Sequence, residues 1–216
     1  MRRFFLFDNF NTWYDWRLTL TAKDTTAPEP KTNYVALDGA HGTLDLTEAL
    51  TGEVTYGDRT VAAAFWSSEG TRQDREAVVR QIISGLHGKK VKIVEPDDPD
   101  HYFLGRVQVK GLERSMVHVA FEIEAICDPW RYALTETRRH VDVDEAVNVV
   151  IRNSGVKTLC PDIAVEGSVT LTYGGASVEL TDGVYKIADI KLRSGFNVVG
   201  VSGRGSVTFT YREATL

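Results

Sequence analysis

Apolar and polar residues alternate along most of the chain with a period of two, which is typical of half-buried β-strands. In the clearest run, residues 117–127, apolar side chains occupy every odd position, and Glu122 and Glu124 fall on the opposite face. Residues 16–22 show the same alternation near the amino end. The pattern predicts a mainly β protein, with further strands at residues 59–66, 91–94 and 102–110.

One segment has a helical period instead. Its apolar residues form a single stripe, which consists of Val78, Val79, Ile82, Ile83 and Leu86. Thr71 and Asp74 have the spacing of a capping box, and Gly88 suits a left-handed stop after the last turn. We therefore expect one α-helix, over residues 71–86, that packs against the strands.

The pattern changes again after residue 132. Short strand patterns then alternate with turn signals at the spacing of roughly 8–12 residues that is typical of β-sandwiches. We place the domain boundary between residues 134 and 135, which predicts a β-rich domain over 1–134 and a small β-sandwich over 135–216. Two further stretches are interpreted as turns, residues 200–205 as a hairpin turn and residues 95–100 as an exposed hairpin loop with two prolines.

Composition and charge narrow the class of protein. The chain has 216 residues, of which 43% are hydrophobic and 25% charged, as in an ordinary soluble globule. Its formal net charge of −5 offers no basic field to hold phosphates, so nucleic-acid binding is not expected as the main activity. The first apolar run ends at Asp8, too early for a signal peptide, and the longest run, residues 61–66, is too short to span a membrane.

Residue types that perform catalysis or bind metals form no recognisable pattern. The five histidines lack metal-ligand spacing, and the acidic loop before His101 lacks the order of an EF-hand. Neither a nucleophile elbow nor a marked pair of carboxylates is present. Cys127 and Cys160 fall in different predicted domains and are interpreted as reduced core residues. We expect no enzymatic activity, no cofactor and no metal ion.

The most informative stretch is residues 34–66. Gly39 and Gly42 flank a turn, where glycine can adopt a positive φ. Asp45 follows in the run Leu44-Asp45-Leu46-Thr47, and Arg59 begins the strand that ends at Trp66. The stretch therefore predicts a strand, a tight turn and a return strand that leads into the sheet.

Two later stretches also stand out. In Tyr102-Phe-Leu-Gly105-Arg106, the glycine indicates a bulge or a close backbone approach. Cys127-Asp128-Pro129-Trp130-Arg131-Tyr132 is interpreted as the turn that ends the first domain. Arg59 and Arg106 can each pair with a carboxylate through two hydrogen bonds. The partner can be an aspartate of the same subunit (Asp45, Asp58 or Asp128) or a group on a neighbouring subunit.

Taken in order, these stretches resemble the distal tail proteins of long-tailed bacteriophages, the siphophages. That family has a similar Gly-x-x-Gly-x-Leu-Asp-Leu … Tyr-x-x-Arg pattern, a helix-Gly-Lys-strand passage like residues 86–93, a Tyr-x-Gly-Arg strand and a closing Cys-Asp-Pro-Tyr-x-Tyr. The resemblance is specific over residues 34–132 and looser beyond. It implies a tail-tube-like, ring-forming first domain and a second domain of galectin-like or jelly-roll type. The motif positions in this chain are Gly39, Gly42, Asp45, Arg59, Tyr102, Gly105, Arg106, Asp128, Pro129 and Trp130.

The resemblance also implies a function. Six copies would form a ring at the distal end of the tail of a phage or prophage-derived particle, as a structural virion protein assembled in the host cytoplasm. The ring would link the tail tube protein to the baseplate or tip hub protein and the receptor-binding protein, with DNA passing through a central channel. The alternative is a carbohydrate-binding β-sandwich for host-surface adhesion. The aromatic residues available for that are Tyr173, Tyr185, Phe196 and Tyr211, most of which alternate as core residues.

Overall fold

The structure, a computed structural model, describes residues 3–216. The chain divides into two compact units, the first up to Trp130 and the second from Arg131 to Thr215. The sequence-based boundary, after residue 134, lies a few residues further along the chain. Strands dominate both units, which confirms the prediction of a mainly β protein.

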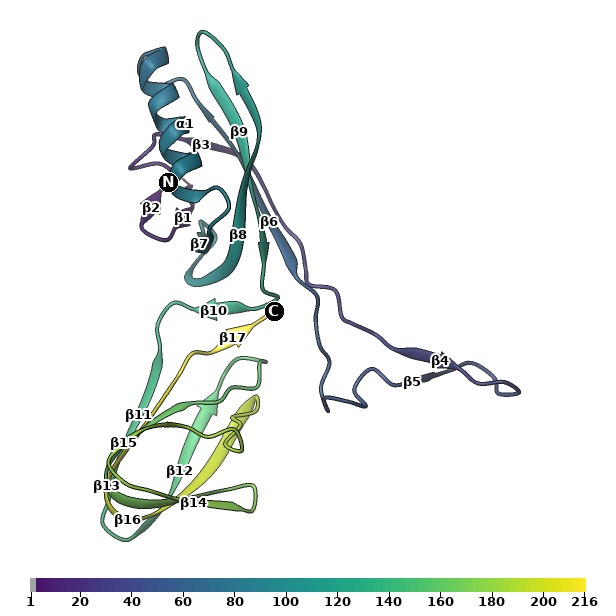
Figure 1. Ribbon diagram of the computed structural model, residues 1–216, viewed down its shortest axis with the longest axis vertical. Coiled ribbons are helices and arrows are strands. Elements are labelled where there is room, and N and C mark those ends of the chain that lie inside the picture. Colours follow the sequence, from purple (N-terminus) through teal and green to yellow (C-terminus); the bar gives the residue numbers. More distant parts are fainter. Residues whose placement is uncertain (1–2) are drawn as a thin grey trace. The chain divides into compact units, whose positions relative to one another are not determined.

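The first unit is built on one antiparallel sheet with the strand order β2-β1-β7-β8-β9-β6-β3 (Figure 1). Its long central strands alternate strictly between buried and less buried residues, as the period-two pattern predicts. The strands are β1 (Leu6–Phe7), β2 (Phe10–Asn11), β3 (Thr19–Thr25), β6 (Arg59–Ser67), β7 (Lys90–Glu95), β8 (Asp98–Arg114) and β9 (Val119–Cys127).

The helix α1 (Arg72–Leu86) covers one face of this sheet (Figure 1). Thr71 is its N-cap and forms the expected capping box with Asp74, and Gly88 follows the helix with a φ of +78°. Of the predicted apolar stripe, Val78, Val79, Ile82 and Leu86 pack into the same core as the buried side chains of β6 and β9, whereas Ile83 is exposed. Each of these buried side chains contributes about 1.5–3 kcal/mol relative to an exposed one, so the predicted helix is stabilised mainly by its contact with the sheet.

Two details of this sheet differ from the sequence-based expectation. The predicted hairpin at residues 95–100 is present, but its turn is only two residues long, because β8 begins at Asp98 and Pro99 is tolerated near the start of a strand. Val117 is not in a strand either. The Ser115 hydroxyl accepts hydrogen bonds from the backbone N–H groups of residues 117 and 118, which closes a turn there and delays β9 to Val119.

The chain between β3 and β6 forms an arm, defined here as residues 29–58. Its two short strands, β4 (Tyr34–Ala36) and β5 (Thr43–Asp45), pair only with each other and make a separate two-stranded sheet. Backbone hydrogen bonds from Lys31 to Thr55 and from Gly57 to Glu29 continue the ribbon down to the main sheet. Figure 1 shows the arm running away from the body of the first unit.

The second unit is a six-stranded antiparallel sheet that closes around its own core. The long strand β16 (Gly195–Tyr211) is its spine, because β11, β12 and β13 all pair with it. A short pair, β10 (Arg131–Ala133) and β17 (Ala214–Thr215), joins the two ends of the unit. The other strands are β11 (Thr137–Val143), β12 (Ala146–Asn153), β13 (Asp162–Tyr173), β14 (Ala176–Leu180) and β15 (Gly183–Lys186).

The predicted hairpin turn at residues 200–205 is wrong, because β16 runs through this stretch without a break. Gly203 and Gly205 have φ values of +120° and +141°, a backbone region that other residues rarely adopt. A Cβ atom at Gly205 would lie 1.9 Å from the Glu166 carbonyl oxygen. The glycines therefore let β16 approach β13 closely. Closely spaced glycines can thus indicate a close contact between strands as well as a turn.

Candidate assembly surfaces

The arm exposes apolar side chains that the described structure does not cover. Every residue from 31 to 45 is exposed. On one face of the ribbon Val35 lies opposite Leu44, and Tyr34 is exposed on the other face. Leu50, in the turn after β5, is 97% exposed. A two-stranded ribbon is only marginally stable alone, and a cluster of exposed apolar groups marks an interaction surface.

Local hydrogen bonds give the arm a defined shape in spite of its exposure. At its tip Gly39 and Gly42 have φ values of +82° and +80°, which permits the tight turn between β4 and β5. At the inner end of the β4–β5 ribbon, hydrogen bonds from the Thr47 side chain and backbone lower the pKa of Asp45. The Thr47 hydroxyl also accepts the backbone N–H of Asn33 from the opposite side of the ribbon. These turns and hydrogen bonds therefore fix the conformation of the arm in the absence of a partner.

The arm also carries a concentrated negative charge. Between residues 29 and 58 there are six carboxylates and only one lysine, so this segment alone accounts for a net charge equal to that of the whole chain, −5. The rest of the molecule is therefore neutral overall. Charges of one sign that gather on a surface favour a partner with charges of the opposite sign.

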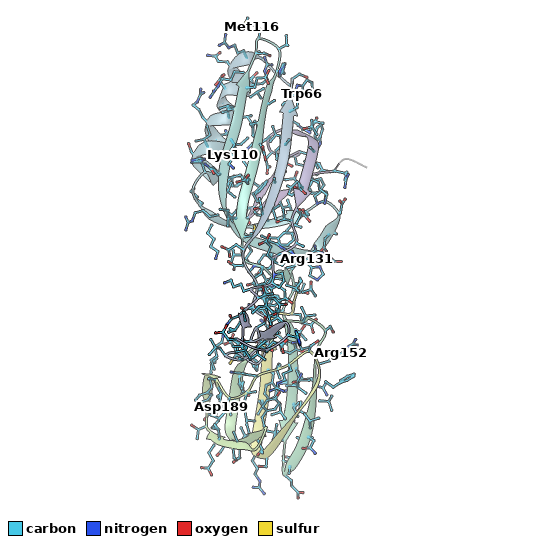
Figure 2. All side chains as sticks on the ribbon, turned by 90° about the vertical axis from the view of Figure 1, so that its right-hand side faces the viewer. Trp66, Lys110, Met116, Arg131, Arg152 and Asp189 are labelled. Carbon is cyan, nitrogen blue, oxygen red and sulfur yellow. The ribbon has the colours of Figure 1, made fainter. Side chains whose placement is uncertain are left out.

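The sheet of the first unit has a second open surface, the face opposite α1. Alternation places the even-numbered residues of β6, β8 and β9 on this face, including Trp66 and Lys110, which are labelled in Figure 2. Cations predominate on β7 and β8, and carboxylates on β9, where Glu124 pairs with Lys110. The face is therefore polarised in charge across the strands, and it also exposes the apolar side chains of Trp66 and Ile126.

The edge strand β3 is the third candidate surface. Among the described residues β3 pairs only with β6, so its other side presents backbone donors and acceptors. Such an edge is a template for another strand. Because the arm continues directly from β3, the edge and the arm lie on the same side of the sheet.

Most of the motif residues lie together at the end of the sheet from which the arm emerges. Arg59, the first residue of β6, is only 4% exposed, and its guanidinium lies 5.1 Å from the centre of the Phe103 ring. Gly105 lies against Cys127, where a Cβ atom would come within 2.3 Å of the sulfur. Tyr102 is buried beneath the Lys92 ammonium group. These positions therefore pack the foot of the sheet, and burial raises the pKa of Cys127 to about 12.

The remaining motif residues lie at the margins of this foot. Arg106 is exposed and donates a hydrogen bond to the backbone oxygen of Gly88. Asp128 forms an ion pair of 3.0 Å with Lys90, and Trp130, which follows Pro129, contacts the Tyr56 ring edge-on. Gly39, Gly42 and Asp45 stand apart from them in the arm. The motif thus divides between a packed foot and an exposed arm, a division that its spacing in sequence did not indicate.

Within residues 3–216 no group of three or more histidine, cysteine, aspartate or glutamate side chains could hold a metal ion. Neither cysteine forms a disulfide, and Cys160, expected in the core, is only half-buried. The part of the chain that the structure describes contains no helix long and apolar enough to cross a membrane.

Comparison with known proteins finds a similar structure but no similar sequence. No family model matches the chain, and no curated protein is similar to it in sequence. The crystal structure of the Dit protein of phage SPP1, described as a paradigm of the hub adsorption apparatus in phages that infect Gram-positive bacteria, is similar to it with a TM-score of 0.70. The identity is 14%, and the match covers 98% of this chain and 99% of that one. Over nearly its whole length the chain therefore has the fold of the SPP1 Dit protein, which agrees with the fold that the resemblance to distal tail proteins implies.

Proposed function

We propose that this chain is a structural protein of a phage tail, whose copies form a closed ring at the distal end of the tail. Six copies are proposed from the family resemblance. The ring joins the tail tube to the tip hub and the receptor-binding apparatus, and DNA passes through its centre. The likeness to SPP1 Dit over nearly the whole chain supports a tail role.

The arm is the observation that best supports a ring. It exposes an apolar face and a strong negative charge, and it continues from a free sheet edge on one side of the first unit. When one surface of each copy binds a different surface of the next copy, and each contact adds the same rotation, the copies form a closed ring if the rotations add up to a full turn. Burial of the apolar face of each arm would contribute about 25 cal/mol per Å² of apolar surface removed from water.

The test is a shortened arm. Lys31 and Thr55 are hydrogen-bonded neighbours across the ribbon, so residues 32–54 can be replaced by Asn-Gly, which favours a two-residue hairpin turn. We expect this variant to remain folded and monomeric under conditions in which the wild type forms rings, measured by light scattering. Rings of unchanged size without the arm would refute the proposal.

A specific observation also favours the alternative of carbohydrate binding, confined to the second unit. Phe196 is 75% exposed beside a hollow of about 720 Å³ that Lys191 and Arg193 also line. Tyr173 lines the same hollow but is only half-exposed, whereas Tyr185 and Tyr211 do not line it. An exposed ring can stack against a sugar. Binding of a glycan array by the wild type that Phe196→Ala abolishes would establish this activity, and an array without signal would dismiss it.

A further inference from the structure

The hollow of about 720 Å³ in the second unit lies beside the start of β16 and combines an aromatic ring with charged groups. Phe196, which is 75% exposed, lines it together with Val198, Lys191 and Arg193. Its lining contains one carboxylate, that of Asp189 (Figure 2). Hollows of roughly 300–1,000 Å³ are typical of sites for small ligands, so the size of this one fits a ligand of a few chemical groups.

Cations surround the Phe196 ring and are not neutralised by the protein. Lys191 and Arg193 line the hollow, and the Arg152 guanidinium, labelled in Figure 2, lies 5.8 Å from the centre of the ring. Within residues 3–216 none of these three cations forms an ion pair, whereas Arg212 of the same unit pairs with a glutamate. An exposed ring among unpaired cations fits a ligand that has both an apolar face and a negative charge.

Hydrogen bonds fix the backbone that carries these groups. The Asn197 side chain, which is only 6% exposed, accepts the backbone N–H of Arg193 and donates to the backbone oxygens of Arg193 and Gly195. The Tyr173 hydroxyl lies 2.6 Å from the backbone oxygen of Lys191. These bonds use backbone atoms and leave the two cationic side chains exposed. A ligand therefore meets a loop that is already in place, which lowers the ordering cost of binding.

A second hollow, of about 460 Å³, adjoins the first, and Val198 lines both. Gly200, which has no side chain, lies in it between Asn148 of β12 and Thr172 of β13. No charged residue belongs to its lining, and within residues 3–216 the side chains of Asn148, Thr172 and Ser202 form no hydrogen bond. Free amide and hydroxyl groups can bind the hydroxyl groups of an uncharged sugar. The two hollows thus differ in the chemistry that they offer.

We infer that the two hollows together bind an anionic glycopolymer, a polysaccharide that carries phosphate or carboxylate groups. The inference rests on the carbohydrate binding proposed above for the second unit and names its ligand class. One sugar stacks on Phe196, and its anionic group pairs with Lys191, Arg193 and Arg152. The next, uncharged sugar of the polymer occupies the second hollow. A neutral glycan would leave the three cations without a counter-charge.

A glycan array with neutral, carboxylated and phosphorylated members tests the ligand class. The full wild-type chain should bind anionic members at least tenfold more tightly than neutral members with the same sugar backbone. Because the contact is partly electrostatic and exposed, this binding should weaken as the salt concentration rises. A preference between carboxylated and phosphorylated members identifies the anionic group.

Charge reversal locates the site. Lys191→Glu with Arg193→Glu should weaken binding to anionic members at least tenfold, and Lys191→Gln with Arg193→Gln should act in the same direction. Both side chains are exposed, so these variants should keep the melting curve of the wild type, measured by circular dichroism. Arg139→Glu with Arg204→Glu is the matched control. It changes the net charge equally at exposed cations of the same unit that form no ion pair, and it should bind like the wild type.

The outcomes separate the ligand class from carbohydrate binding itself. Binding of neutral members that tolerates the charge reversal but is lost in Phe196→Ala overturns the anionic ligand and keeps carbohydrate binding. An equal loss in the charge reversal and in its control shows an effect of net charge alone and overturns the site. An array without signal overturns both proposals for the second unit, whereas the proposed ring, which rests on the arm of the first unit, is unaffected.

Discussion

The body and the arm of the first unit use apolar residues in opposite ways. In the body, one core is formed by the alternating residues of β6 and β9 and by the buried residues of α1. These apolar side chains bury one another. In the arm, the same kind of alternation produces a ribbon whose apolar face meets no other part of the described chain. The contrast shows that a strand pattern specifies a face to be buried but not the molecule that buries it.

This comparison predicts that substitutions in the body lower stability, whereas those in the arm lower assembly. All four tryptophans, at positions 13, 16, 66 and 130, belong to the first unit. Tryptophan fluorescence during denaturation therefore reports the stability of that unit without a contribution from the second.

The largest loss of stability is expected for Arg59→Glu. The substitution buries a carboxylate in place of a cation that packs on the Phe103 ring, and an uncompensated buried charge costs about 3–5 kcal/mol. Urea denaturation of the monomer should show this loss, with Arg59→Lys less affected because it keeps the charge. A variant with wild-type stability but defective assembly would place Arg59 at the ring interface instead.

Gly105→Ala should come next, with a loss of about 1–3 kcal/mol. Its Cβ atom would lie 2.3 Å from the Cys127 sulfur and 2.9 Å from the Ile126 carbonyl oxygen, so the two strands must separate. The double variant with Cys127→Ala should lose less than the sum of the single variants, because the sulfur contact is then removed. Strict additivity in the denaturation midpoints would argue against this contact.

Thr71→Ala should cost about 1 kcal/mol, the usual effect of losing an N-cap. The Thr71 side chain accepts the backbone N–H of Asp74 and completes the capping box of α1. Thr71→Ser, which retains the hydroxyl, is the matched control and should stay near the wild type. An equal loss for both substitutions would exclude the cap as the cause.

Acid should weaken the same helix start. Hydrogen bonds from the Thr71 side chain and backbone lower the pKa of Asp74. The stabilisation is therefore complete above the pKa of the unfolded state, about 4, and is lost as the pH falls through the lower pKa of the folded state. Asp74→Asn should flatten the stability profile below pH 4, and an unchanged acid profile would contradict this assignment.

The smallest change in stability is expected for Leu44→Ser in the arm, within about 0.5 kcal/mol of the wild type. Its effect should appear in assembly, because Leu44 contributes to the exposed apolar face of the ribbon. Val184→Ser, at an exposed apolar position of the second unit, should alter neither property. A clear loss of stability in the Leu44 variant would mean that the arm packs within its own subunit.

The sequence predicts the body well because burial there follows local rules. The period of residues 117–127 and the capping box at Thr71 depend on neighbours within a few positions, and both appear in the structure apart from the turn at Val117. The route of the arm is not predictable in this way. Residues 34–47 have the pattern of an ordinary hairpin, and only the absence of a covering layer in three dimensions distinguishes them.

Glycine-rich stretches were ambiguous for a related reason. Gly203 and Gly205 were interpreted as a turn, whereas they allow β16 to cross close to β13, and the sequence alone does not distinguish these uses. The exposure of Ile126 was also missed, although the alternation of residues 117–127 places this even position on the outward face with Glu122 and Glu124. A signal existed in the arm, where six carboxylates lie within thirty residues of an otherwise neutral chain.

The most direct test of the account is the mass of the native particle. Native mass spectrometry of the purified protein, alone and with its tail tube and hub partners, should show one closed species of six copies, with no open series of intermediate sizes. A single monomeric species under all these conditions would contradict the claim that copies of this chain hold one another through the arm.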